Sequence, residues 1–142
     1  MIRMNSQSFS QQEPAWLETK LGEQWLRVVD VRPAADYARG HIPFAVNLDV
    51  FATLYDPDGS LVSAGELALL MSTLGVGDAH LVVFVDGAVP HAATAAARAL
   101  AKYGHRDVHI LAGGHPRWIA EGGSIARDQV RHKPTSFTAR VV

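Results

Sequence analysis

The sequence contains no cysteine. This absence excludes disulfides, thiolate metal sites and every mechanism that uses a thiol. Charge is balanced, because 13 Lys and Arg against 14 Asp and Glu leave a formal net charge of -1, unlike the basic surfaces that bind nucleic acid or anionic membranes. No apolar run approaches the roughly 20 residues of a membrane span, and the polar start of the chain lacks the apolar core of a signal peptide. We therefore expect a cytoplasmic protein that binds neither nucleic acid nor membrane.

The sequence does have enough apolar material for one folded domain. Its 142 residues are 48% hydrophobic, which suits a single core. Residues 1–13 are rich in Ser and Gln, so we expect a disordered leader there. We place the folded domain at residues 14–125. Residues 126–142 are charged at first, then extended and apolar, which predicts a linker toward a second domain that this sequence does not contain.

Strand and helix signals alternate along the folded part of the chain. This order is typical of an α/β domain, and it predicts a parallel sheet of about five strands with helices on both faces. We expect strands at residues 26–32, 45–48, 81–85 and 108–111, and helices starting at Pro14, at residues 34–39, after Ser63, at residues 92–103 and at residues 116–121.

The unit at the centre of this order is a strand, a tight loop and a helix. Residues 81–85 form a continuous apolar run, and an Ala-rich helix follows at residues 92–103. Ligands of parallel sheets bind at the carboxyl ends of strands, where a helix N-terminus also attracts anions. The intervening loop is therefore a candidate site for a small anion, although it offers no obvious nucleophile. Its residues are Asp86, Gly87, Ala88, Val89, Pro90 and His91.

Two ordered motifs identify a family. The first comprises Val29-Asp30-Val31-Arg32, then Tyr37, then Gly40-His41-Ile42-Pro43, and the second is Leu-Ala-Gly-Gly-His-Pro-Arg-Trp at residues 111–118. The chain resembles a rhodanese-like domain, the fold of sulfurtransferases that carry a persulfide on a loop cysteine. It is most similar to the first, non-catalytic domain of the tandem enzymes that act on thiosulfate or 3-mercaptopyruvate.

The resemblance implies a catalytically silent domain of a sulfurtransferase. First domains of the tandem enzymes carry Asp where second domains carry the cysteine, and Asp86 falls at this position. The implied partner is a second rhodanese-like domain, or a second copy of this chain, and no cofactor is implied. This chain departs from the family at Phe44, where glycine is common, and at Ala112, where an acidic residue is common. We expect Gly113-Gly114 to serve a positive φ or a close approach to the neighbouring loop.

Two alternatives come from other classes of protein. The chain could be a free-standing, cysteine-less module that binds a partner or an anion at the loop. It could also be a hydrolase with Asp86 as its nucleophile. The loop lacks the arginine of an oxyanion clamp, and Pro90 has no N–H to donate. Asp86 is therefore more simply a loop carboxylate that the helix N-terminus stabilises.

Three further residues are candidates near the first motif. Asp30 and Arg32 end a predicted strand, where they could form a binding site or a charge-assisted pair that fixes the turn. His41 matches the turn whose histidine is implicated in proton relay in the mercaptopyruvate branch of the family, with Asp30 or Asp36 as its partner. The alternative is a histidine bonded to backbone. His105 and His109 are four residues apart, a spacing that suits a metal only on a helix, and they flank the start of a predicted strand, so we expect no metal site.

Overall fold

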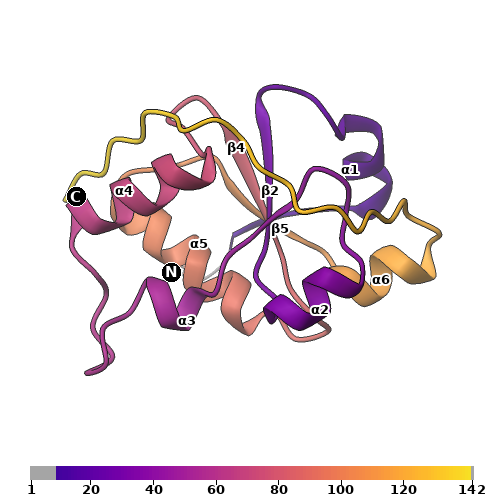
Figure 1. Cartoon of the computed structure of the whole chain (residues 1–142), viewed down its shortest axis with the longest axis horizontal. Coiled ribbons are helices and arrows are strands. Elements are labelled where there is room, and N and C mark those ends of the chain that lie inside the picture. Colours follow the sequence, from indigo (N-terminus) through magenta and orange to yellow (C-terminus); the bar gives the residue numbers. More distant parts are fainter. Residues whose placement is uncertain (1–8, 142) are drawn as a thin grey trace, which may run out of the picture.

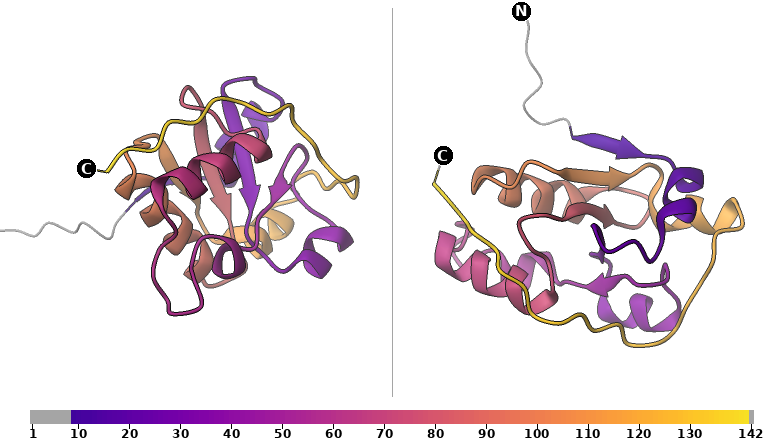
Figure 2. Two further views of the ribbon diagram at one scale, coloured as in Figure 1. Left: turned by 60° about the vertical axis from the view of Figure 1, so that its left-hand side comes forward. Right: turned by 90° about the horizontal axis from the view of Figure 1, so that it is seen from above.

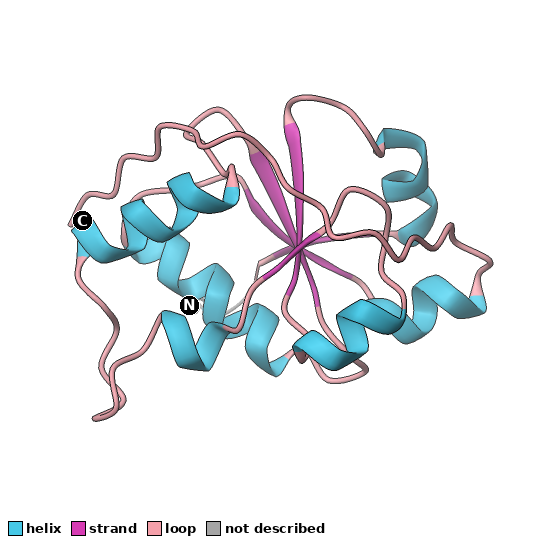
Figure 3. Cartoon of the chain, in the orientation of Figure 1, coloured by secondary structure: helices cyan, strands magenta, loops and turns pink. Residues whose placement is uncertain are grey.

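The computed structural model describes residues 9–141 and contains a five-stranded sheet with the strand order β1-β5-β4-β2-β3. Every neighbouring pair of strands is parallel. Figure 3 shows the sheet edge-on, with its strands crossing one another in the centre of the molecule. The α/β fold with a parallel sheet is therefore confirmed. The strands are β1 (Ser10–Gln12), β2 (Leu26–Asp30), β3 (Val46–Asn47), β4 (Leu81–Val85) and β5 (Val108–Leu111).

Helices cover both faces of the sheet (Figure 1). One layer holds α3 (Val50–Thr53), α4 (Ala64–Leu74) and α5 (His91–Lys102), and the other holds α1 (Pro14–Lys20), α2 (Ala34–Arg39) and α6 (Gly114–Ala120). Successive side chains of a strand point to opposite faces. Val82 and Phe84 of β4 enter the first layer, whereas Val83 and Val85 enter the second. Both faces of β4 are buried, and its sequence is therefore apolar throughout. No helix within residues 9–141 has the length and hydropathy to cross a membrane.

The helices flanking β4 follow their local sequence signals. Ser63 and Glu66 form a capping box at the start of α4, and Gly75 ends this helix at a φ of 86°. The alanine face of α5 lies in the core, where small side chains let the helix approach the sheet closely. That face is covered by the chain itself, so it is not available to a partner. Its buried members are Ala93, Ala96, Ala97 and Ala99.

The start of the described chain differs from the expected leader. Residues 1–8 lie outside the described residues. Phe9 packs against the core, and Ser10–Gln12 forms β1, which pairs with β5 at the sheet edge. An edge strand needs only backbone hydrogen bonds on one side, so its sequence can be polar and carry no periodic signal. The helix that begins at Pro14 ends at Lys20, slightly before the end near Gly22 that its sequence predicts.

Residues 126–141, called the C-terminal segment below, pack against this domain. Figure 2 (right) shows the segment running along the sheet edge outside β3, opposite the edge formed by β1. At its start Ala126 pairs with His41 in a short antiparallel bridge. Farther on, the Thr135 N–H donates to the Ser72 carbonyl at 3.0 Å, and Phe137 is buried in the core beside α5. The segment that we expected to be a linker thus bonds to this domain at several points and buries one side chain, Phe137, in its core.

Candidate functional site at the carboxyl edge of the sheet

The carboxyl ends of β2, β4 and β5 bring the sequence motifs together. Asp30 ends β2, Asp86 follows β4, and Gly113-Gly114 follows β5. Because these strands are parallel neighbours in the sheet, their ends meet at one edge. The first and second motifs therefore flank the predicted loop, although about seventy residues separate them in the sequence.

The Asp86 carboxylate is turned back into its own loop. Its Oδ1 accepts the Gly87 N–H at 2.7 Å, and its Oδ2 accepts the Ala93 N–H at 2.8 Å. The second bond satisfies one of the free N–H groups in the first turn of α5, where negative charge is favoured. The interpretation of Asp86 as a loop carboxylate stabilised by the helix N-terminus is confirmed. Two donors that could have held an external anion are thus engaged.

The rest of the loop is exposed and has few side chains that could bind a ligand or react with it. Ala88, Val89, Pro90 and His91 are all exposed, and Gly87 is partly buried. The His91 N–H donates to the Val89 carbonyl at 2.9 Å, which closes the turn before α5. Pro90 has no N–H to offer. Among the candidate binding residues of this loop, only backbone groups and the His91 imidazole are left to meet a ligand.

Asp30 and Arg32 form a buried ion pair that fixes the next turn. The Arg32 Nη2 lies 2.8 Å from Asp30 Oδ2, and the two side chains are 11% and 1% exposed. The same Nη2 donates to the Gly40 carbonyl at 2.7 Å. The pair thereby joins the end of β2 to the Gly40-Pro43 turn. The structural interpretation of this pair is confirmed, and removing one partner of such a buried pair typically costs about 3–5 kcal/mol.

His41 is fully buried beneath the C-terminal segment. Its Nδ1 lies 2.9 Å from the Ile42 carbonyl, and its Nε2 lies 2.6 Å from the Asp128 carbonyl. The Tyr37 ring stacks on the imidazole at 4.1 Å. A carbonyl oxygen accepts hydrogen bonds and cannot donate them. Both contacts can therefore be hydrogen bonds at the same time only if both ring nitrogens carry a proton.

This arrangement departs from the expected relay. The carboxylate oxygen that approaches His41 belongs to Asp128, at 3.9 Å, and not to Asp30 or Asp36. Both ring nitrogens face backbone, so neither is left for a substrate in this structure. The Asp128 contact could not be found from the motif, because Asp128 lies 87 residues away along the chain.

Gly113-Gly114 passes very close to the loop after β4. Both residues have positive φ, at 74° and 63°. A Cβ on Gly114 would lie 2.1 Å from the Gly87 carbonyl oxygen, a distance that no side chain tolerates. The neighbouring His115 N–H donates to the Asp86 carbonyl at 2.8 Å. The expected close approach and positive φ are both confirmed.

A pocket of about 360 Å³ opens beside these elements. Arg32, Arg39, Arg127 and His115 line it together with Asp36, so positive side chains outnumber negative ones there. Arg32 is already paired with Asp30, and Arg39 with Asp36 at 2.9 Å. No group of three histidine or carboxylate side chains within the described range could hold a metal ion.

The sequence predicts no role for His115 beyond its place in the second motif. Its Nδ1 is buried and has no hydrogen-bond partner among residues 9–141. Burial lowers the pKa of its imidazole below the ordinary value, and the positive charge of Arg32 lowers it further. A motif position cannot reveal such a state, since it depends on what covers the ring.

Comparison with known families decides the assignment. The model of the rhodanese-like domain matches residues 13–121. The chain belongs to this family. Phe44, at the position where the resemblance implies glycine, has a φ of 71°, in the left-handed region that a bulky side chain disfavours.

Individual relatives agree with the family. The chain is 34% identical over 119 residues to a thiosulfate sulfurtransferase of Pseudomonas aeruginosa, covering 82% of this chain and 44% of the relative. It is 31% identical over 124 residues to the sulfur carrier protein TtuD of Thermus thermophilus, covering 86% and 44%. The rhodanese-like chain thus spans less than half the length of these curated relatives.

A solved structure shows the same fold. SseA from Escherichia coli, a 3-mercaptopyruvate sulfotransferase, superposes with a TM-score of 0.83 at 25% identity, over 95% of this chain and 56% of that one. The match extends well beyond residues 13–121 and therefore includes much of the C-terminal segment. This rhodanese-like domain is related to the thiosulfate and 3-mercaptopyruvate sulfurtransferases.

Proposed function

We propose that this chain is the catalytically silent domain of a tandem sulfurtransferase, which takes sulfur from thiosulfate or 3-mercaptopyruvate. The observation that carries the proposal is the loop after β4, where a carboxylate bonded to its own backbone stands in place of a thiol. Relatives named for sulfur transfer or sulfur carriage, each about twice as long as the match, support it. A second rhodanese-like domain in the same protein would supply the cysteine.

The loop chemistry argues against activity in this domain. Sulfur transfer needs a thiolate as nucleophile and carrier, and the sequence has no cysteine. Asp86 is a poor substitute, because both of its oxygens accept N–H bonds that stabilise the negative charge. A hydrolase would also need a group to stabilise an oxyanion, and Ala88, Val89 and Pro90 supply none.

We infer that the partner domain covers the apolar surface beside this loop. Phe51 is 50% exposed and Val89 is 72% exposed. Both line a groove of about 720 Å³ that also includes Tyr55 and His91. The Phe51 ring lies 5.5 Å from the His91 ring. Apolar and aromatic side chains that gather on one surface favour a protein partner.

Activity of the purified chain tests the silent assignment. With thiosulfate and cyanide, we expect thiocyanate to form at the rate of buffer alone. Turnover above that rate that scales with protein concentration, and that Asp86→Asn abolishes, would overturn the proposal.

Sedimentation velocity tests the covered surface. The isolated chain should self-associate as its concentration rises, because the surface around Val89 lacks its partner. Val89→Asp should reduce the association. Leu69→Asp is the matched control, since Leu69 on α4 is 70% exposed and lies outside the groove. A chain that stays monomeric at high concentration would contradict this part of the proposal.

A further inference from the structure

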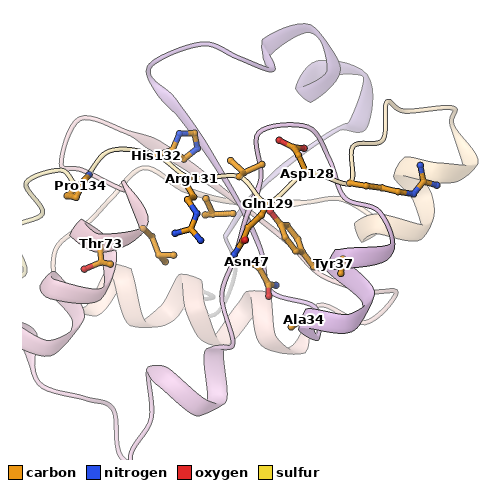
Figure 4. A pocket seen from close by; sticks show the side chains of 14 residues that line it. Ala34, Tyr37, Asn47, Thr73, Asp128, Gln129, Arg131, His132 and Pro134 are labelled. Atoms are coloured by element: carbon orange, nitrogen blue, oxygen red, sulfur yellow. The ribbon is translucent and has the colours of Figure 1, made fainter.

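A separate cavity lies beneath the C-terminal segment, away from the carboxyl-edge loop. Its volume is about 690 Å³, within the range of roughly 300–1,000 Å³ that small-molecule sites occupy. Residues 127–132 and Pro134 form its roof, and Val46 and Asn47 of β3 form its floor. Parts of α2 and of the end of α4 form the sides (Figure 4).

The roof is held at both ends. Before the cavity, the Arg127 Nε donates to the Arg39 carbonyl at 3.1 Å, and the Asp128 carbonyl contacts the buried His41. Beyond it, the Thr135 hydroxyl donates to the Val76 carbonyl at 2.6 Å. The cavity therefore exists before any ligand arrives, and binding does not have to order the roof.

The sides of the cavity are mainly apolar. Ala34, Ala38 and Leu74 contribute aliphatic surface, and Tyr37 contributes its ring. The Tyr37 hydroxyl is already used, because it donates to the Ala45 carbonyl at 2.6 Å. This surface suits the apolar body of a small molecule rather than a sugar or a free inorganic ion.

The roof adds an unneutralised positive charge. Arg131 forms no hydrogen bond or ion pair with the described part of the chain, and Figure 4 shows Arg131 and Gln129 pointing from the roof into the cavity. The acidic residue of the roof, Asp128, has a side chain that is 70% exposed and approaches His41. His132 adds no second charge at neutral pH, because burial and the nearby Arg27 lower the pKa of its imidazole.

We propose that this cavity binds a small organic carboxylate with an apolar body. The guanidinium of Arg131 takes the carboxylate in a forked, charge-assisted contact, and the Gln129 amide donates beside it. The apolar body lies between the Tyr37 ring and Leu74. The site is separate from the proposed sulfurtransferase partnership, and neither depends on the other.

Titration calorimetry with 2-naphthoate tests the site. We expect binding to the wild-type chain, and Arg131→Gln should weaken it about tenfold or more, the loss typical of a charge-assisted contact. Lys133→Gln is the matched control, because it removes the same charge from the same segment at a residue that does not line the cavity. It should change the affinity less than about twofold, as expected for an exposed charge. The neutral isostere 2-naphthylmethanol should bind about as weakly as naphthoate binds to Arg131→Gln.

A cavity-filling variant separates this site from adventitious charge binding. Ala38→Trp on α2 keeps every charge and fills the space, and it should abolish naphthoate binding while circular dichroism shows a folded chain. The proposal is overturned by an absence of binding at about 1 mM naphthoate, a concentration at which weak specific ligands still register. Equal losses in Arg131→Gln and Lys133→Gln, or unchanged affinity in folded Ala38→Trp, would overturn it too.

Discussion

Replacing Gly114 by Ala is expected to be among the most destabilising small substitutions in this protein. The added Cβ would lie 2.1 Å from the Gly87 carbonyl oxygen and 2.7 Å from that of Asp86. Both carbonyl oxygens belong to the backbone, so rotation of a side chain cannot relieve the clash. The left-handed φ of 63° adds about 1–2 kcal/mol for a residue with a Cβ. Moving the loop breaks the bond between the His115 N–H and the Asp86 carbonyl, which costs about 1–3 kcal/mol when the groups stay buried. The total loss is roughly 2–5 kcal/mol.

Urea unfolding followed by tryptophan fluorescence measures this loss. Gly59→Ala is the matched control, because Gly59 has a φ of 87° but nothing within 4 Å of its ideal Cβ. The control should lose only the backbone contribution, about 1–2 kcal/mol. Hydrogen exchange of the His115 amide should accelerate in Gly114→Ala and not in Gly59→Ala. Equal losses of stability in the two variants, with unchanged exchange at His115, would refute the reasoning that the close approach holds the loop.

Three further predictions concern single side chains. Asp86→Asn should lower the free energy of unfolding by about 1 kcal/mol, because it weakens the acceptor for the Ala93 N–H and removes the charge at the helix N-terminus; an unchanged urea midpoint would contradict this. The pKa of His115 is lower in the folded state than its ordinary value, so the unfolded state binds the proton more tightly. As the pH drops below about 6.5, the free energy of unfolding of the wild type should therefore fall relative to that of His115→Gln. A constant difference between the two proteins from about pH 8 to pH 5 would count against the desolvation of this imidazole. Phe44→Gly should stabilise the chain by up to about 1 kcal/mol, because glycine adopts a left-handed φ without strain and the Phe44 side chain is half-exposed. A lower midpoint of thermal unfolding would show that contacts of the ring outweigh the strain.

Much of the centre of the fold could be predicted because its signals are local. The apolar run of β4, the capping box at Ser63 and the alanines of α5 each specify their own element through hydrogen bonding or periodicity. Gly113-Gly114 was also predictable, since only glycine tolerates both a positive φ and a backbone within van der Waals contact. The sequence at each of these positions therefore indicates the local conformation directly.

The remainder depends on contacts that sequence spacing does not encode. β1 is a short polar strand that exists because β5 offers it a row of backbone groups. The partner of His41 comes from Asp128, and the orphaned nitrogen of His115 depends on what covers the ring. The cavity beneath the C-terminal segment is likewise invisible in the sequence, because it is bounded by four separate parts of the chain.

The path of the C-terminal segment also affects how this protein meets other copies of itself. β3 is only two residues long and forms one edge of the sheet, and an open edge is a template on which a strand from another molecule can add. The segment runs outside this edge, with the cavity between them. A foreign strand would first have to displace the contacts of His41 and Thr135, whereas a small molecule needs only to enter from the side. Loss of these sixteen residues, 126–141, would therefore expose the edge at β3 to pairing with strands of other molecules and so promote aggregation.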